Sequence, residues 1–305
     1  MRSQVIILML LSGFFTSSCK TKDENGKTKT EQSGTDSSQE GTAIDYKYDL
    51  THPKKKLGLP PELLEISGNS WVDKDHLLVI EDLRPNLYLV KLGDTSATVE
   101  KKVQFKEDIL GKKFDVEDVT MVNNIPYALW SHGSIYKISN WQSKPQVQEI
   151  PTFLSKDNNT EGICYDPVTH NLLVACKNES DVSDEKKSTR AIYQFDLKAD
   201  TLQQTPFMLI HKKDFKEVTS EKVEFFPSAI AVHPITHDIY ILSTKDTKCM
   251  AVYTHEGKFK AFELIDKELM PQPEGICFSP DGLLYISTEG KEGGRGYILE
   301  FDFKK

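Results

Sequence analysis

The sequence predicts an all-β fold built from repeated four-stranded units, and three observations support this prediction. From about residue 45 onward, short runs rich in Ile, Val, Leu, Tyr and Phe alternate with turns rich in Gly, Pro, Asn and Asp. No long stretch follows the period of an amphipathic helix, which is about 3.6 residues. Similar segments also recur along the chain about every 50 residues, which is typical of a repeat architecture.

The repeat is clearest in two segments that are almost the same. Residues 161–167 read EGICYDP and residues 274–280 read EGICFSP, and a second apolar run follows each of them. A third copy, SAIAVHP, begins at residue 228, and two weaker copies begin at residues 67 and 117. A third apolar run usually follows the second. Each unit therefore predicts an inner strand and at least two further strands.

Five such units predict a β-propeller with five blades, because a period of about 40–50 residues with four strands per unit is typical of that fold. Six blades are the alternative, if a degenerate blade lies in the long interval between residues 161 and 228. The last unit has no outer strand after Phe303, so we expect residues 45–50 to supply it. Such an N-terminal strand would close the ring and remove an exposed edge.

The N-terminus predicts export and a lipid anchor. A positive start precedes an apolar run over residues 5–15, which is shorter than the roughly 20 residues of a bilayer span but suits a signal peptide. The small residues before Cys19 resemble a bacterial lipobox, in which the cysteine is lipidated, for example with palmitate. We therefore expect a signal peptide over residues 1–18, lipidated Cys19 with a disordered tether over 19–44, and the propeller domain over 45–305. A plain secretory signal is the alternative.

Composition limits where the protein acts and what it binds. The net charge is −8 and no long basic block is present, so nucleic acid is not an expected partner. The charged stretch after Cys19 resembles the surface-export signal of Bacteroidetes lipoproteins. We expect a monomer in the bacterial cell envelope, outside the cytoplasm, attached to a membrane through its lipid, with the outer membrane favoured. The other four cysteines form no CxxC pair and are expected to be buried thiols, and a disulfide between Cys164 and Cys176 is the alternative.

Several segments resemble the SdiA-regulated (YjiK-like) family of β-propeller proteins. They read EISG at residues 65–68, NTEGICYD at 159–166, FPSAIAVHP at 226–234 and QPEGI at 272–276. The resemblance spans about residues 57–303, nearly all of the folded part. It implies an extracytoplasmic propeller and specifies neither a reaction nor a ligand.

The repeat also predicts which residues gather at one mouth of the central channel. Consecutive strands of a blade are antiparallel, so the start of each inner strand and the end of the second strand meet at the same face. Lys177 follows a second strand and is expected there too. The predicted ligand or metal residues at this mouth are Ser67, Glu81, Asp82, Glu117, Glu161, Ser228, Glu274 and Glu289.

This ring of carboxylates is consistent with a cation site. Calcium takes six to eight oxygen ligands from such groups, whereas close carboxylates without a counter-charge raise one another's pKa. Ca²⁺ is therefore a candidate cofactor, with Glu117, Glu161 and Glu274 as candidate ligands.

Arginine offers another source of positive charge. The chain has only four arginines, and three of them fall between the second and third strands of a blade, at Arg84, Arg190 and Arg295. The same geometry places them at the channel mouth. There they would either form salt bridges with the acidic ring or make a mixed-charge pocket for an anionic or zwitterionic ligand.

The sequence thus favours a lipid-anchored propeller that binds a small ligand or a protein partner at the channel mouth and performs no chemistry. The alternative is a calcium-dependent hydrolase, of lactonase or phosphoesterase type, that uses an acidic channel. No residue is assigned a catalytic role, because no HExxH motif or nucleophile elbow is present. A scaffold that binds a protein on another face is the third hypothesis.

Overall fold

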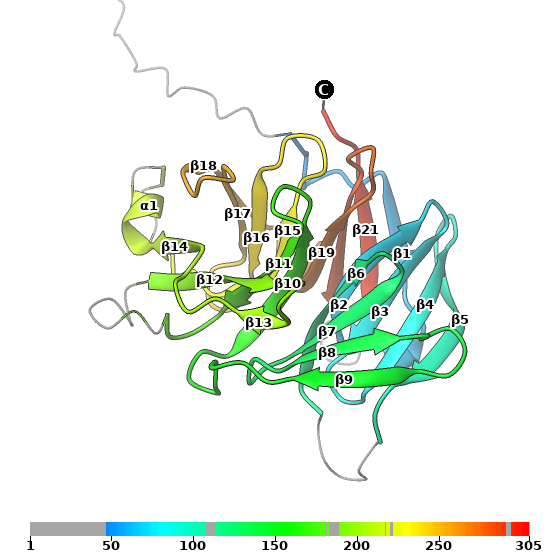
Figure 1. Ribbon diagram of the computed structural model, residues 1–305. Coiled ribbons are helices and arrows are strands. Elements are labelled where there is room, and N and C mark those ends of the chain that lie inside the picture. The colour runs from blue at the N-terminus through cyan, green and yellow to red at the C-terminus, as the bar shows by residue number, and fades with distance from the viewer. Residues whose placement is uncertain are drawn as a thin grey trace, which may run out of the picture. The chain divides into compact units, whose positions relative to one another are not determined.

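Each of the five repeated segments forms the inner strand of one antiparallel sheet in the computed structural model, which describes residues 47–107, 114–180, 182, 189–216, 218–219, 222–290 and 294–304 (Figure 1). Each inner strand contacts the inner strand of the next blade, and the last contacts the first. The chain is therefore a five-bladed β-propeller, as the repeat predicts. The inner strands are β2 (Ile66–Asp73), β6 (Val116–Val122), β10 (Thr160–Asp166), β15 (Pro227–Val232) and β19 (Gln272–Phe278).

The blades run outward from these strands in chain order. The first blade continues with β3 (His76–Glu81), β4 (Asn86–Leu92) and β5 (Ala97–Gln104). The second continues with β7 (Ile125–Trp130), β8 (Ile135–Ser139) and β9 (Gln146–Ile150). The fourth continues with β16 (Ile239–Ser243), β17 (Cys249–Tyr253) and β18 (Phe259–Leu264).

The third blade contains the long interval of the repeat. It continues with β11 (Asn171–Cys176) and β12 (Thr189–Asp196), and its outer edge is divided between β13 (Thr201–Leu202) and β14 (Met208–His211), which both pair with β12. The short helix α1 (Lys212–Lys216) follows and buries Phe215. The extra residues thus enlarge this blade, and the described part of the chain forms five sheets.

The fifth blade is closed by a strand from the N-terminal side, as expected, but the strand lies later in the chain. The blade contains β20 (Leu284–Glu289) and β21 (Tyr297–Phe301), and β1 (Lys55–Gly58) pairs antiparallel with β21. A single 3₁₀ turn, Pro61–Leu63, then leads to β2. The expectation that residues 45–50 form this strand is therefore corrected to Lys55–Gly58.

Local hydrogen bonds explain why the segment before β1 is not a strand. Asp49 Oδ1 accepts hydrogen bonds from the backbone N–H of Thr51 (3.1 Å) and from its hydroxyl (2.6 Å), which fixes a turn. Pro53, just beyond it, has no N–H for a ladder. Tyr48 and Leu50 instead pack into the core with only 1 % and 2 % exposure. Residues 47–50 therefore contribute side chains to the core and add no strand to the sheet.

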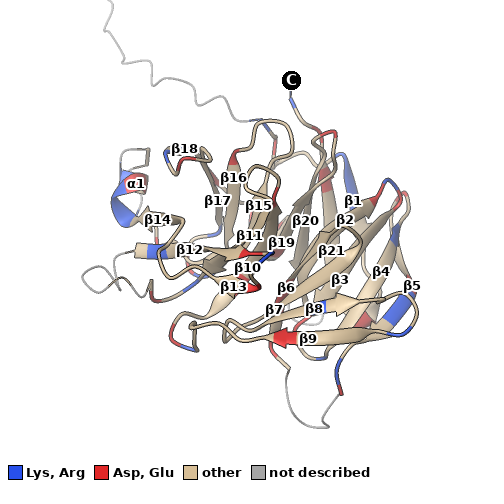
Figure 2. Cartoon of the chain, viewed as in Figure 1, with Lys and Arg blue, Asp and Glu red and all other residues tan. Residues whose placement is uncertain are grey.

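The hydrophobic core lies between adjacent blades. Leu78 and Ile80 of the first blade pack with Val119 and Ala128 of the second, and the other interfaces repeat this pattern. Figure 2 shows that charged residues lie mainly in loops and on outer strands such as β5 and β9. The four described cysteines are buried thiols, as expected: Cys164, Cys176, Cys249 and Cys277.

The described residues belong to one compact unit, Ile44–Lys305. The predicted signal peptide, Cys19 and the tether up to residue 44 lie outside the described residues, so they stay predictions. In the described part of the chain, no helix is long and apolar enough to cross a bilayer.

Candidate functional site

A polar cavity of about 280 Å³ lies at the mouth where the inner strands begin. We call it the acidic well, because six of its nine lining residues carry a carboxyl group and one carries an amine. It is lined by Ser67, Asp82, Asp115, Glu117, Asn159, Glu161, Lys177, Glu274 and Glu289. Residues from the start of inner strands and from the end of second strands meet here, as strand direction predicts.

A β-bulge at the start of every inner strand aims these side chains. The register between inner and second strand shifts across one residue in each blade, for example between Val116 and Asp118 and between Pro273 and Gly275. A bulge adds an unpaired residue and redirects its side chain. The five bulged residues are Ser67, Glu117, Glu161, Ser228 and Glu274.

In two blades, the residue two positions before the bulged residue adds a further polar group to the acidic well. Asp115 and Asn159 adopt positive φ angles of 63° and 47°, which Asp and Asn tolerate better than most residues. Asp115 Oδ2 accepts a hydrogen bond of 2.5 Å from the Ser131 hydroxyl, and Asn159 Nδ2 donates one of 2.6 Å to Glu161 Oε1. Neither residue was predicted to line the mouth, because the repeat does not specify where side chains before the inner strand point. An Asp or Asn two positions before the repeat start is the signal that marks this left-handed turn.

Lys177 supplies the positive charge inside the acidic well. Its Nζ lies 3.0 Å from Glu161 Oε1, and both side chains are largely buried. Burial lowers the pKa of Lys177, but the carboxylates of Glu161 and Glu274 outweigh it and raise the pKa above its usual value. Lys177 is therefore a cation at neutral pH. The sequence predicted that Lys177 lies at the mouth. It could not predict that Lys177 pairs with Glu161, because strand order does not give the distance between the two side chains.

The carboxyl groups of the acidic well resist ionisation. Burial, and then the charge of Glu161, raise the pKa of Glu274 to about 8. Burial also raises the pKa of Glu117 well above its usual range, with further contributions from Glu161, Asp115 and Asp82. The pKa of Glu161 is raised by burial as well, although Lys177 offsets part of this effect. Protonation therefore removes part of the negative charge at neutral pH.

Two of the residues predicted at this mouth lie outside the acidic well. The Glu81 carboxylate turns to the backbone N–H of Leu83 (2.9 Å) and the Tyr88 hydroxyl (3.4 Å). The Ser228 hydroxyl donates to the Pro273 carbonyl (3.0 Å) and holds two adjacent blades together.

The three predicted arginines do not line the acidic well. Arg84 is exposed on the loop between β3 and β4. Arg190 is buried in β12, donates to the Thr189 carbonyl (2.9 Å) and lies 4.7 Å from the centre of the Phe226 ring. Arg295 lies against β1 at Gly58 and lines a separate cavity. The expectation of a mixed-charge pocket built by arginine is therefore replaced by one built around Lys177.

The predicted calcium ligands share one cavity but do not form a preformed metal centre. Glu117, Glu161 and Glu274 all line the acidic well. Over the described ranges, however, no three His, Cys, Asp or Glu side chains lie close enough together to hold a metal ion. Lys177 sits beside Glu161, where a cation would otherwise compensate that carboxylate.

Comparison with known proteins gives the family and the fold. The family model described as SdiA-regulated matches residues 45–291. A search of curated proteins gave no significant match.

Solved structures that resemble the chain belong to proteins of different kinds, and the following three are enzymes. Glutaminyl cyclase from Myxococcus xanthus has a TM-score of 0.54 and 13 % identity, over 83 % of this chain and 96 % of that one. A PQQ-bound aldose sugar dehydrogenase from Streptomyces coelicolor has a TM-score of 0.51 and 12 % identity, over 82 % and 97 %. A gluconolactonase from Xanthomonas campestris has a TM-score of 0.46 and 10 % identity, over 79 % and 76 %. At these identities the likeness concerns the fold alone.

Proposed function

The chain belongs to the SdiA-regulated family, and on that premise we propose that it is a lipid-anchored binding protein of the bacterial cell envelope. Its ligand is a small molecule that carries positive charge, and the acidic well binds it. The observation that supports this proposal is the composition of the acidic well, where six carboxyl groups surround one lysine. The anchor is proposed from the N-terminal sequence, in which small residues lead to Cys19.

Glu117 and Glu274 are the groups proposed to receive the ligand. Within the described residues, neither carboxyl group has a hydrogen-bond or ion-pair partner, whereas Glu161 is engaged by Lys177. A cationic group placed between Glu117 and Glu274 would favour their ionised forms and would make charge-assisted hydrogen bonds. Binding should therefore release protons.

Three four-carbon probes of matched length test the sign of the ligand's charge. We expect 1,4-diaminobutane to raise the melting temperature and to bind in calorimetry, and 1,4-butanediol and succinate to do neither. The affinity of the protein for 1,4-diaminobutane should rise between pH 6 and pH 8.5, because the pKa of Glu274 is about 8 and the ionised carboxylate binds the cation. Glu274→Gln should weaken diamine binding about tenfold or more, since a charged hydrogen bond contributes roughly 1.5–3 kcal/mol. Binding of succinate without diamine binding would contradict the proposal.

A calcium-dependent hydrolase is the second candidate function, favoured by the fact that Glu117, Glu161 and Glu274 line one cavity. A carboxyl group with a raised pKa is suited to general acid–base catalysis. Lys177 and the absence of a three-ligand metal group in the described part of the chain argue against a calcium site.

Thermal melting with calcium tests this second function. A metal that binds only the folded protein stabilises it by about 2.7 kcal/mol at a hundredfold excess over Kd. If the hydrolase hypothesis holds, calcium should raise the melting temperature, magnesium should do so less, and Glu161→Gln should reduce the calcium effect. No calcium shift in the unmodified protein would remove this function and leave the binding protein.

A further inference from the structure

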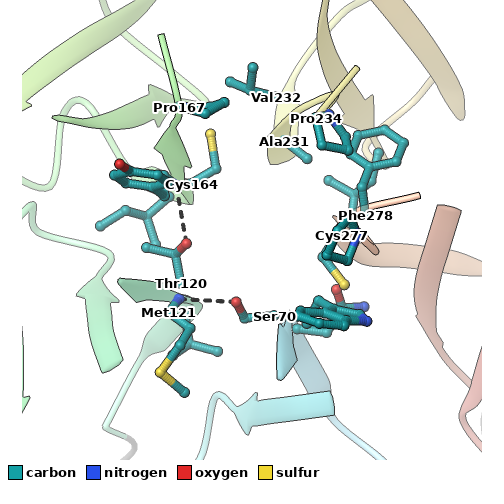
Figure 3. Close-up of a pocket in the computed structure, with 17 residues that line it drawn as sticks. Ser70, Thr120, Met121, Cys164, Pro167, Ala231, Val232, Pro234, Cys277 and Phe278 are labelled. Atoms are coloured by element: carbon teal, nitrogen blue, oxygen red, sulfur yellow. Dashed lines mark hydrogen bonds between the residues drawn. The ribbon is translucent and has the colours of Figure 1, made fainter. Parts of the chain in front are cut away.

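A second cavity, of about 260 Å³, lies at the opposite mouth, where the inner strands end (Figure 3). The residues three and four positions after each bulged residue line it in all five blades. None of its lining residues is charged, so it differs chemically from the acidic well. We call it the apolar mouth.

The walls of the apolar mouth offer few hydrogen-bonding groups. The Ser70 hydroxyl accepts a hydrogen bond from the backbone N–H of Met121 (3.0 Å; Figure 3). The Thr120 hydroxyl accepts one from the backbone N–H of Tyr165 (3.1 Å). Three prolines, which have no N–H, also line the cavity. Burial raises the pKa of the Cys164 and Cys277 thiols, so both are neutral. These walls suit an apolar molecule.

Two residues of this lining are exceptions: the buried indole Nε1 of Trp71 has no hydrogen-bond partner among the described residues, and Asn69 has two such atoms. Asn69 is the one whose side chain both donates and accepts. It occupies the second position after its bulged residue, where the other four blades have Val119, Ile163, Ile230 and Ile276. Its side chain is 2 % exposed, yet neither Oδ1 nor Nδ2 has a hydrogen-bond partner among the residues that the structure describes. Each buried polar group without a partner costs roughly 1–3 kcal/mol. An aliphatic residue would avoid that cost. The stability of the fold therefore does not explain why an amide occupies this position.

The fold makes room for this amide. Gly275 lies beside it, and a Cβ atom at that position would come within 3.1 Å of Asn69 Nδ2 and closer still to Ser287 Oγ. The Ser287 hydroxyl is also fully buried and has no partner within the described ranges. Two polar groups of this kind, on neighbouring blades, therefore flank one glycine.

We propose that the apolar mouth binds a small apolar molecule with one polar end that both donates and accepts hydrogen bonds, as a primary amide does. The Asn69 amide offers one acceptor and one donor group, so it pairs with an end that offers the complementary two. The remaining wall receives the apolar part. A charged end is disfavoured, because the cavity provides no opposite charge. This site is independent of the acidic well.

Two probes of nearly the same shape test the proposal: hexanamide, and 2-heptanone, in which a methyl group replaces the amide nitrogen. Trp71 lines the cavity, so binding should change its fluorescence, and calorimetry gives the affinity. We expect the unmodified protein to prefer hexanamide by about tenfold, because the ketone leaves the Asn69 carbonyl unpaired. Equal affinities, or no saturable binding of either probe, would overturn the proposal and leave a cavity that holds only water.

The matched variant is Asn69→Leu, which copies the aliphatic residues of the other blades. It removes a buried amide without a partner, so it should fold at least as well as the unmodified protein. We expect it to bind 2-heptanone at least as tightly as hexanamide. Glu62→Gln, at an exposed residue that lines neither cavity, is the control and should leave the preference for hexanamide unchanged. A preference that persists in Asn69→Leu would also overturn the proposal.

Discussion

The Glu274 carboxyl group is packed in the acidic well, and no cation among the described residues forms an ion pair with it, although Lys177 and Lys248 offset part of its raised pKa. Burial penalises the ionised form, and the charge of Glu161 adds to the penalty. At neutral pH the folded protein therefore holds a proton that the unfolded chain has released. This difference links the stability of the fold to pH.

The first prediction concerns Glu274→Gln. The folded-state pKa of about 8 lies above the unfolded value of 4.5, so the stability of the unmodified protein should fall as pH rises from about 4.5 to 8. Gln keeps the shape and cannot ionise. Relative to the unmodified protein, the variant should gain about 4 kcal/mol between pH 5 and pH 8.5, which is roughly three pH units at 1.36 kcal/mol each. Urea unfolding across this range measures it. The exposed Glu62→Gln is the control, and parallel profiles for Glu274→Gln and the unmodified protein would refute the prediction.

The second prediction concerns Cys19. If this residue carries the anchor, cells given radioactive palmitate should label the unmodified protein and not Cys19→Ser. The variant should also move from the membrane fraction to the soluble one. The buried Cys249→Ser serves as the control and should label normally. Equal labelling of Cys19→Ser and the unmodified protein would leave a plain secretory signal.

For single residues, the sequence predicted which side chains lie at the channel mouth better than it predicted which of them form ion pairs. Repeat alignment placed Glu117, Glu161 and Glu274 at one mouth because each takes the same place before an inner strand. It offered either calcium or the three arginines as the compensating charge, the arginines because they fall between the second and third strands of a blade and present a bidentate fork. In the structure, Lys177 supplies this positive charge, whereas the Arg190 guanidinium lies over the Phe226 ring. Side-chain direction after a strand end depends on local packing that the repeat does not specify.

Among the elements, β1 is one of the shortest strands, yet it completes the last blade of the ring. Four residues pair with β21 and complete the last blade, and Leu57 is fully buried against the first blade. The sequence predicted that an N-terminal strand would do this because the last unit lacked an outer strand. It missed the position, because both segments are short and only the packing of Tyr48 and the turn at Asp49 distinguish them.

The third prediction follows from this role of β1. A chain that lacks residues 47–58 loses β1 and the buried Tyr48 and Leu50, and it exposes the edge of β21. We expect it to lose several kcal/mol of the roughly 5–15 kcal/mol that stabilises such a domain, or to aggregate. Thermal unfolding and gel filtration measure both outcomes. A chain that lacks residues 20–40 is the control and should melt like the unmodified protein, whereas equal melting of the two truncations would show that β1 does not close the ring.

For the whole molecule, ring closure joins parts of the chain that are far apart in sequence. Tyr48 donates a hydrogen bond of 2.6 Å to the Gly282 carbonyl of the last blade, and its oxygen lies 2.9 Å from His233 Nε2 in the fourth. His233 Nδ1 accepts from the backbone N–H groups of Ile235 (3.2 Å) and Thr236 (3.0 Å). This arrangement requires a neutral imidazole with its proton on Nε2.

The fourth prediction is that acid weakens this closure through His233. Burial lowers its pKa to about 4, below the ordinary value of 6.5. The unfolded chain therefore binds a proton first as pH falls, and stability should decrease between about pH 6.5 and pH 4 and change little from this cause below it. The shift corresponds to about 3 kcal/mol, which is a large share of the stability of one domain.

His233→Asn is the variant that separates this effect from general acid unfolding. Its side-chain oxygen can still accept from Ile235 and Thr236, but it cannot be protonated in this range. It should be less stable than the unmodified protein at pH 7, because the hydrogen bond to Tyr48 is lost, and the difference should shrink as pH falls to 4. His170→Asn, on a turn of the third blade, controls for the loss of an imidazole. Urea unfolding at a series of pH values measures each difference, and a constant gap between His233→Asn and the unmodified protein would show that this histidine does not couple ring closure to pH.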